Sequence, residues 1–411
     1  MTSLIAREPY AGKWCAFGGA SLVFFFLNAA TFTSLGVVLF TMGADLHWSN
    51  TNTGYGFTAL GLACGLSSPL AAVSMTLLGG RGSLGLGAAL LAIGFGVAAI
   101  TQTLAVFFVA MMFLGVGYTL AGNVPGVYLL AGWFRRRSAP IIGYYLMMGA
   151  LGAAFGPPVV EAIVRHYGWR IHWQVMAAAA AGIAAICLLI VRDAQDAPAP
   201  QTVAATPAGI GAGWSYRQAI LTPQFLLVCG AMIMTMCCVT TNSSSLVAHL
   251  VKLGASPKAA AYVLSAGALT ATMVKGGSGR LCELVSPPVL LGAGLLFQAV
   301  GCTLLAMATT PLLQYGSALT FGIGWGLSFV AAHIVPLNYF GGVTGAKILS
   351  VVALLTTLAA AGPLAAGMIA DHTGSFSPIY DIYAVLLLIL AVPVVMMRAP
   401  RHKAVLPVAA E

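Results

Sequence analysis

Long apolar stretches, separated by short polar segments, follow one another along almost the whole chain. A helix needs about 20 mostly apolar residues to cross the hydrocarbon core of a bilayer, and about twelve stretches meet this requirement. The pattern therefore predicts an all-α membrane protein with twelve transmembrane helices. The predicted spans are 16–42, 52–78, 82–102, 104–133, 139–162, 172–191, 222–250, 257–278, 287–308, 312–337, 345–369 and 379–397.

The composition agrees with this class. Of the 411 residues, 60% are hydrophobic and 7% are charged, whereas a soluble domain carries about 25% charged residues. A soluble enzyme, a nucleic-acid-binding protein and a disordered scaffold are therefore excluded. The eight cysteines lie mostly inside apolar runs, without metal-ligand spacing or a disulfide framework. We expect them to pack as small apolar residues, and we expect neither a metal site nor a cofactor.

The distribution of the basic residues predicts the orientation. With the N-terminus inside, the cytoplasmic segments carry 13 Lys and Arg residues and the outer loops carry four. Because cytoplasmic loops are enriched in Lys and Arg, we expect both termini in the cytoplasm. The first apolar run is too long for a cleavable signal peptide. The expected location is the plasma membrane, as for a multi-pass protein of the bacterial inner-membrane type, and the lipid bilayer rather than nucleic acid is the expected surrounding partner.

One interior segment and an internal repeat divide the chain into two halves. Residues 192–217 are rich in Ala, Pro and Gly and lack apolar periodicity, which predicts a flexible cytoplasmic linker. It separates a six-helix bundle in 1–191 from a second one in 218–411. Several residues recur at a constant offset of 206: Phe134 with Phe340, Gly156-Pro157 with Gly362-Pro363, and His166 and Gly168 with His372 and Gly374. Parallel repeats of six helices resemble the major facilitator fold, whose substrate sites lie between the halves near the bilayer midplane.

Short motifs resemble one group within that superfamily. An aromatic-Phe pair, a basic cluster and a glycine ladder follow one another in Trp133-Phe134-Arg135-Arg136-Arg137, Gly143, Gly149 and Gly156-Pro157-Pro158. Further matches are Ser34-Leu35-Gly36-Val37, Trp48-Ser49, His249, Tyr339-Phe340-Gly341 and Asp371-His372-Thr373-Gly374. Together they resemble the monocarboxylate transporter and oxalate:formate antiporter group. The resemblance implies a secondary transporter of a small organic anion, and not an enzyme.

Departures from the group's pattern affect the expected gate and the expected substrate. Thr76 stands where the superfamily usually has an acid before Gly79-Gly80-Arg81, so a weaker latch is expected in the first half. Around Leu354 and Leu355, where oxalate carriers have a second embedded lysine, this chain has apolar residues, which disfavours a dicarboxylate. The resemblance assigns the gate to Arg81, Arg136 and Arg137 in the first half, and to Arg280 with Glu283, in place of the usual Asp, in the second.

Lys275 is the one Lys or Arg that we place inside a membrane span, since Lys258 and Lys347 stand within three residues of a span's start and are counted with the loops. A charge at the bilayer centre costs about 2.5–3.5 kcal/mol on insertion scales, so such cations are rare and usually functional. Lys275 lies eight residues before Glu283, the spacing at which the resembling group has its substrate-binding arginine. The resemblance therefore implies that Lys275 anchors a carboxylate. The alternative is that Lys275, roughly 6 Å from the predicted helix end, extends its side chain to the cytoplasmic interface.

Trp325, Phe329 and His333 are spaced i, i+4 and i+8 and are expected to share one helix face. The resemblance places Trp325 and Phe329 where oxalate carriers have a pocket tryptophan and a pocket tyrosine. His333 is a candidate carrier of a transported proton, because an unperturbed histidine titrates near pH 6.5. The alternative for His333 is a neutral side chain that is hydrogen-bonded between helices.

The first half offers polar candidates without an embedded charge. Asn28 and Thr31 are three residues apart in the first span and are expected to share a face. Tyr118 and Asn123 lie in the fourth span, and Tyr144 and Tyr145 in the fifth. By resemblance, Asn123 stands where oxalate carriers have a pocket tyrosine. Hydrogen bonding between helices, without any substrate contact, is the alternative for each of these residues.

These observations predict a carrier that works by alternating access and moves a monocarboxylate-like anion, as a monomer. Coupling is expected by proton symport or by anion exchange. An uncompensated cation in the unloaded cavity would disfavour closure and would therefore favour exchange. Two other functions stay open on the sequence: efflux of lipophilic compounds, which an aromatic cavity would also serve, and a membrane sensor that does not transport.

Overall fold

The computed structural model describes residues 10–134, 138–193 and 214–400, and its regular structure is helical throughout these ranges. The first half contains α1 (Tyr10–Ala30), α2 (Phe32–Asp45), α3 (Asn50–Ala99), α4 (Leu104–Ala121), α5 (Asn123–Trp133) and α6 (Ser138–Leu189). The second half contains α7 (Tyr216–Ile220), α8 (Pro223–Lys252), α9 (Pro257–Leu284), α10 (Pro287–Ala306), α11 (Pro311–Phe340), α12 (Gly342–Leu355), the 3₁₀-helix η1 (Thr356–Ala360), α13 (Ala361–Thr373) and α14 (Ser377–Val395).

Twelve membrane spans follow from these elements once the breaks are placed. Gly79 (φ 73°) interrupts α3 and Gly168 (φ 82°) interrupts α6, so each of these long helices makes two passes. A positive φ is accessible to glycine without the steric penalty that a Cβ brings. Conversely, α1 with α2, α4 with α5, and α12 with η1 and α13 each form one interrupted pass. The predicted twelve-helix architecture is confirmed.

Nine helical segments in the described ranges are long and apolar enough to cross a bilayer. The two segments bent at glycine, Asn50–Ala99 and Pro140–Leu189, are among them. The helix missing from this set is α9, which carries four charged residues within its 28 positions. It packs against α11 and α6 in the same way as its neighbours. The chain is a multi-pass membrane protein, and α9 is its most polar pass.

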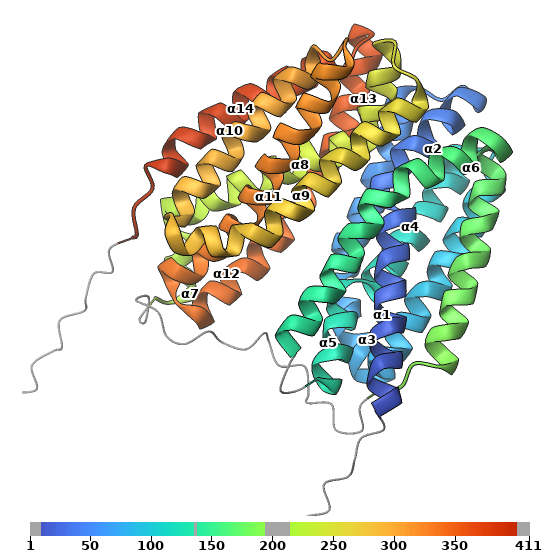
Figure 1. Cartoon of the computed structure of the whole chain (residues 1–411), viewed down its shortest axis with the longest axis horizontal. Helices are drawn as coiled ribbons and strands as arrows, with labels where there is room; N and C mark the ends of the chain where they lie inside the picture. Colours follow the sequence, from blue (N-terminus) through green and yellow to red (C-terminus); the bar gives the residue numbers. More distant parts are fainter. Residues whose placement is uncertain (1–9, 135–137, 194–213, 401–411) are drawn as a thin grey trace, which may run out of the picture.

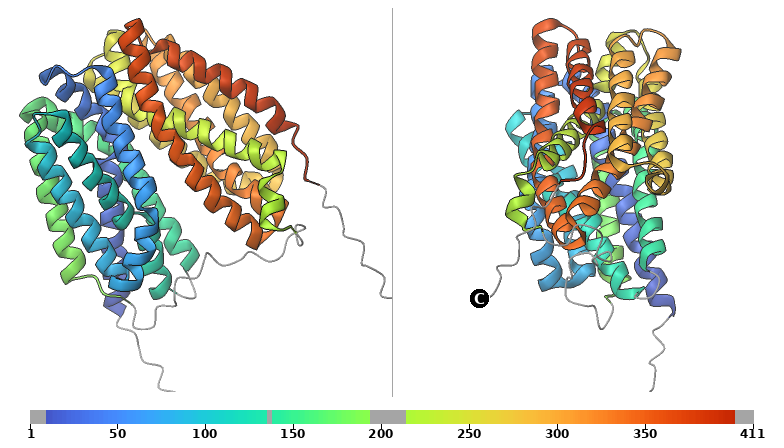
Figure 2. Two further views of the ribbon diagram at one scale, coloured as in Figure 1. Left: turned by 180° about the vertical axis from the view of Figure 1, so that it is seen from behind. Right: turned by 90° about the vertical axis from the view of Figure 1, so that its left-hand side faces the viewer.

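The helices gather in two groups, α1–α6 and α7–α14, called here the N-terminal and C-terminal groups (Figure 1). Their ribbons meet at the end where α2 and α13 are labelled, and they diverge towards the end where α5, α7 and α12 lie. Figure 2 shows the same divergence from behind. We name these the closed end and the open end. The helix ends that flank the two internal undescribed ranges, those of α5, α6 and α7, lie at the open end (Figure 1).

Glycine allows close contact between the groups at the closed end. A Cβ at Gly54 of α3 would lie 2.5 Å from the carbonyl oxygen of Pro363 in α13. Gly36 of α2 packs in the same manner against the backbone of Ser243 and Ser244 in α8. The hydroxyl of Thr58 donates to the carbonyl of Ala360 at 2.6 Å. Small residues permit such backbone approaches in lipid, where no hydrophobic effect draws helices together.

Candidate functional site

Lys275 lies deep in its helix rather than at the helix end. The structure extends α9 to Leu284, six residues beyond the predicted boundary, so Lys275 is nine residues from the end. At 1.5 Å per residue this is about 14 Å, more than twice the distance expected from the sequence. Its ammonium Nζ lies 3.7 Å from the ring centroid of Trp325 and 4.7 Å from that of Phe329. The side chain therefore turns towards α11 inside the C-terminal group.

No carboxylate of the described ranges forms an ion pair with Lys275, since the pairs found there are Arg165 with Glu161 and Arg170 with Asp45. The faces of Trp325 and Phe329 are the contacts that the structure gives its charge. Aromatic faces carry negative electrostatic potential and attract a cation, Trp most strongly. The ammonium is held in place without being neutralised, which leaves it able to attract an anion.

His333 continues the same stripe on α11. Its ring lies 4.6 Å from the ring of Phe329, centroid to centroid. Its Nδ1 lies 2.6 Å from the carbonyl oxygen of Phe329 and donates to it, because a carbonyl can only accept. The indole Nε1 of Trp325 is buried and has no hydrogen-bond partner among the described residues. Trp325, Phe329 and His333 therefore share a face, as their spacing predicted, and that face carries an unused donor.

The polar residues predicted in the first half fall into two sets. Asn28 and Tyr118 meet between α1 and α4, where the Tyr118 hydroxyl donates to Asn28 Oδ1 at 3.5 Å. Asn123 is exposed at the start of α5. Tyr144 is also exposed, with 56% of its surface accessible near the open end of α6. Tyr118 and Asn123 also line a cavity, whereas the Asn28 amide N–H donates to the carbonyl of Phe24 at 2.8 Å.

Thr31 and Tyr145 form the second set, and both are buried. Thr31 interrupts the helix between α1 and α2, and its hydroxyl donates to the carbonyl of Leu27. Tyr145 stacks on Phe24 at 4.6 Å, and its hydroxyl donates to the carbonyl of Gly122 at 3.1 Å. Their polar atoms are satisfied within the N-terminal group, a geometry that favours packing between helices for these two residues.

A cavity of about 330 Å³ lies between the groups, next to the contacts of the closed end. Tyr118 and Asn123 line it from α4 and α5, whereas Lys275 and its aromatic neighbours lie outside this lining. Hydroxyl groups dominate its polar surface. They belong to Ser68, Tyr118, Thr119, Thr240, Thr356 and Thr357. Thr356 and Thr357 were not among the predicted site residues. The signal in the sequence is a pair of threonines after an apolar run, at the point where the eleventh span changes to 3₁₀ geometry.

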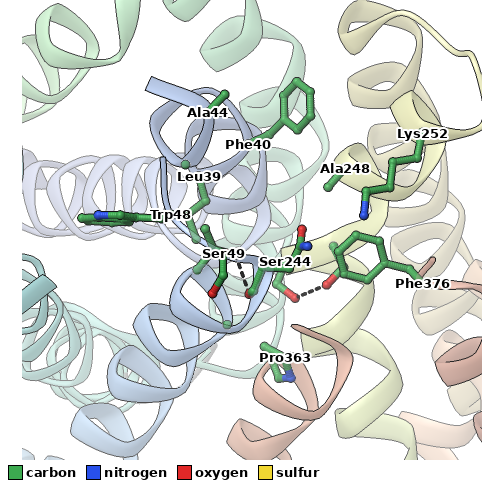
Figure 3. A pocket seen from close by; sticks show the side chains of 15 residues that line it. Leu39, Phe40, Ala44, Trp48, Ser49, Ser244, Ala248, Lys252, Pro363 and Phe376 are labelled. Carbon is green, nitrogen blue, oxygen red and sulfur yellow. Dashed lines mark hydrogen bonds between the residues drawn. The ribbon is translucent and has the colours of Figure 1, made fainter. Parts of the chain in front are cut away.

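A second, smaller cavity of about 220 Å³ lies at the closed end, between α2, α3, α8 and α13. Figure 3 shows Phe40 and Trp48 on the side of the N-terminal group and Lys252 and Phe376 on the other. The ammonium of Lys252 lies 5.0 Å from the ring centroid of Phe376. This cavity is a crevice on the sealed side of the molecule and is separate from Lys275.

Asp371 forms hydrogen bonds between the two groups at the closed end. Its carboxylate accepts four hydrogen bonds from the first turn of α3: from the backbone N–H and the side-chain amide of Asn50 at 3.0 and 2.7 Å, from the backbone N–H of Thr51 at 2.8 Å, and from the Thr51 hydroxyl. A carboxylate is favoured at a helix N-terminus because the free N–H groups and the helix dipole attract negative charge. In the sequence, Asp371 belongs to one of the motifs that carry the resemblance, and that motif implied no role for it.

Comparison with known proteins assigns the family. Residues 21–361 match the sequence model of the Major Facilitator Superfamily. The chain belongs to this superfamily. It is therefore a secondary transporter and not an enzyme. No protein of curated function matches the sequence.

Two solved structures of this superfamily's fold are similar to the whole chain. A bacterial homologue of the human lysosomal transporter Spinster, in an inward-facing and unoccupied conformation, has a TM-score of 0.75 and 16% identity, with 95% of this chain and 97% of that chain covered. A point mutant of the nucleoside transporter NupG has a TM-score of 0.75 and 13% identity, with 93% and 99% covered. At these identities the similarity establishes the fold, and the cargo has to be argued from the site.

The predicted gating residues of this transporter differ in their contacts and in their exposure. The backbone N–H of Arg81 donates to Asp193 Oδ1 at 2.9 Å. Arg280 and Glu283 are exposed at the open end of α9, and no ion pair joins them to another described residue. Arg136 and Arg137 lie outside the described residues. The gating role of all five stays a prediction.

Asp193 provides an acidic side chain at the bend of α3, near which Thr76 replaces the usual acid of the superfamily. Its carboxylate lies over the bend of α3, where a Cβ at Gly79 would come within 2.5 Å of Oδ2 and one at Gly80 within 3.2 Å of Oδ1. Asp193 follows α6, 112 positions away from Arg81 in sequence. The bend between the second and third passes is therefore tied to the end of the sixth pass, although Thr76 is not acidic.

Replacing Asp193 with Ala is expected to lower the stability of the N-terminal group. The change removes a hydrogen bond to a charged acceptor, worth about 1.5–3 kcal/mol when buried and less here because the bond is partly exposed. We expect the thermal unfolding midpoint in detergent to fall by about 2–4 °C. The matched control is Thr76→Ala, because that hydroxyl bonds only to Val73 in its own helix among the described residues. Equal midpoints for the two variants would contradict the role of Asp193.

Proposed function

We propose that the protein carries a small organic monoanion across the membrane, by alternating exposure of a site between its two groups, and that Lys275 binds the carboxylate. The observation that carries this proposal is an ammonium about 14 Å from its helix end, held on two aromatic faces with no described carboxylate as its counter-charge. A charge in such a position is costly in the membrane and is retained where it has a function.

The number of cations supports a monoanion over a dianion. Coulombic attraction strengthens as the dielectric constant falls, so one ammonium in a shielded cavity binds one carboxylate much more strongly than in water. A second carboxylate would need a second cation or would be desolvated without compensation. The eleventh pass has Leu354 and Leu355 at the relevant positions. The resemblance to monocarboxylate carriers is in line with this charge count.

The hydroxyl groups of the larger cavity and the ammonium of Lys275 belong to different helices. We infer that closure of the open end brings these hydroxyl groups and the ammonium to one bound anion. Tyr144 is exposed near the open end of α6, which packs against α9. It lies six residues from the start of α6, about 9 Å, and Lys275 lies nine residues from the end of α9, about 14 Å. Rocking of residues 1–191 against 218–411, joined by the linker 192–217, would carry Tyr144 towards the ammonium. In this scheme the open end and both termini face the cytoplasm.

Counterflow in proteoliposomes tests the proposed cargo. The purified protein is reconstituted with an unlabelled compound inside, and uptake of a labelled panel is measured: short aliphatic monocarboxylates, aromatic monocarboxylates, dicarboxylates, a neutral nucleoside and a lipophilic cation. We expect saturable counterflow of at least one monocarboxylate and little of the dicarboxylates. Uptake confined to the lipophilic cation or the nucleoside would replace the proposal by efflux or by nucleoside transport. No uptake of any compound by folded protein would favour a sensor.

A further inference from the structure

The contact of Lys275 with two rings bears on the coupling of transport, which neither the sequence nor the superfamily decides. A single cation without compensation would hinder the unloaded carrier from closing around it, and such a carrier would have to exchange one anion for another. In the structure, however, the ammonium lies on the faces of Trp325 and Phe329 at 3.7 and 4.7 Å. Ring faces attract a cation most strongly where water is excluded, which is the condition inside a closed carrier.

Both partners of this contact belong to the same group. Lys275 is on α9 and the two rings are on α11, and α9 and α11 pack side by side within the C-terminal group. Rocking of one group against the other leaves distances within a group nearly unchanged. The ring contact therefore accompanies the ammonium through both orientations and through the closed state between them, unlike a contact made across the two groups.

We propose that the faces of Trp325 and Phe329 bind the Lys275 ammonium whenever no anion is bound. This contact lets the unloaded carrier reorient. The protein is therefore a net transporter rather than an obligatory exchanger. This inference rests on the proposed function, since it requires that Lys275 binds the anion. On loading, the carboxylate pairs with Nζ from the side away from the rings. On release, the ring faces remain as the partner of the charge.

The charge balance of such a cycle can be measured. The loaded carrier pairs one ammonium with one monoanion and moves no net charge, whereas the unloaded carrier returns with the positive charge of Lys275. One complete cycle of net efflux therefore moves one negative charge outwards. An outside-negative potential slows this efflux because it opposes the inward return of the cation. Exchange of two identical monoanions uses the neutral loaded form in both directions and is insensitive to the potential.

Comparison of net efflux with exchange, in the same proteoliposomes, tests the inference. Efflux of a preloaded monocarboxylate that supports counterflow is measured into medium without the anion and into medium with it, for the native protein, Trp325→Phe, Trp325→Leu and Phe329→Leu. The matched control is Tyr315→Leu, a 42% exposed aromatic residue on the same helix. We expect the ratio of net efflux to exchange to fall by about tenfold in Trp325→Leu, about 1.4 kcal/mol in the barrier to the unloaded step. Trp325→Phe should be intermediate, and Tyr315→Leu should keep the native ratio.

Each other outcome has a defined meaning. Native protein that exchanges the anion but gives net efflux below about one hundredth of exchange overturns the inference and leaves the proposed function intact. Equal losses of net efflux and exchange in Trp325→Leu, or net efflux that does not respond to a potassium diffusion potential, also overturn it. Failure of every monocarboxylate to exchange overturns the proposed function itself. Trp325→Phe and the potential measurement on native protein keep the test valid if Trp325→Leu does not fold.

Discussion

Replacing Lys275 with Gln is expected to abolish monocarboxylate counterflow at substrate concentrations that half-saturate the native carrier. Removing one partner of a desolvated charge pair costs about 2–5 kcal/mol, so the half-saturating concentration should rise at least about thirtyfold, which 2 kcal/mol corresponds to. Glutamine keeps most of the length of the side chain and its hydrogen-bonding capacity but loses the charge. The measurement is the concentration dependence of counterflow for the best monocarboxylate of the panel.

Two further variants separate charge from position in this experiment. Lys275→Arg keeps the charge but places a planar guanidinium against the rings, and it should restore part of the activity because its fork binds a carboxylate differently. Lys258→Gln removes an exposed lysine from the other end of the same helix and should transport normally. Removing a charge from the membrane interior should also leave Lys275→Gln at least as stable as the native protein. Normal transport by folded Lys275→Gln would reject the carboxylate anchor.

Replacing Asp371 with Asn is expected to open the closed end. The native carboxylate accepts four hydrogen bonds from Asn50 and Thr51 in the opposite group. An amide retains one accepting oxygen and turns its NH₂ group towards donors. The four bonds are solvent-exposed, so we expect their loss to destabilise the closed end by about 1–2 kcal/mol in total. This free energy shifts the equilibrium between the two orientations about 5- to 30-fold towards the state that is open at this end.

Distance measurements between spin labels can follow this shift. Labels at His47 and Lys258, exposed positions of the two groups near the closed end, should show a larger population of long distances in Asp371→Asn than in the native protein. The labels are introduced with Cys15, the exposed native cysteine of the described residues, replaced by Ser. The control is Asp381→Asn, an exposed aspartate on α14 without a hydrogen-bond partner among the described side chains and backbone. Equal distance distributions in the two variants would contradict a latch at Asp371.

The sequence located the membrane passes correctly in outline and placed Lys275 within one of them, but it missed the limits of the passes for a physical reason. Hydropathy predicts α9 to end near residue 278, whereas the helix continues to Leu284. The six added residues include Arg280 and Glu283, and charged residues do not prevent helix formation where they are exposed. The alternative that Lys275 extends to the cytoplasmic interface assumed that short boundary. In the observed conformation Nζ lies on the Trp325 face instead.

The polar candidates of the first half show a second limit of sequence reasoning. Asn28 and Thr31 were expected to share a face, but the chain leaves helical geometry at Thr31 (φ −108°, ψ −116°). Thr31 and Tyr145 are buried with satisfied hydroxyls, while Asn123 and Tyr144 are exposed. A residue type and its spacing do not reveal which neighbour supplies a hydrogen bond, because that neighbour belongs to another helix.

The amino-acid sequence by itself determines that this protein crosses a membrane in twelve helices, because each pass satisfies its own backbone hydrogen bonds and needs only a local run of apolar residues to be stable in lipid. The contacts of its charged side chains are decided by the tertiary structure. Asp193 accepts a hydrogen bond from the backbone N–H of Arg81, 112 positions away, and Asp371 accepts one from Asn50, 321 positions away. Lys275 lies on the ring of Trp325 and not beside a described carboxylate. These contacts depend on how whole helices pack, and packing sums many weak interactions that no local pattern encodes.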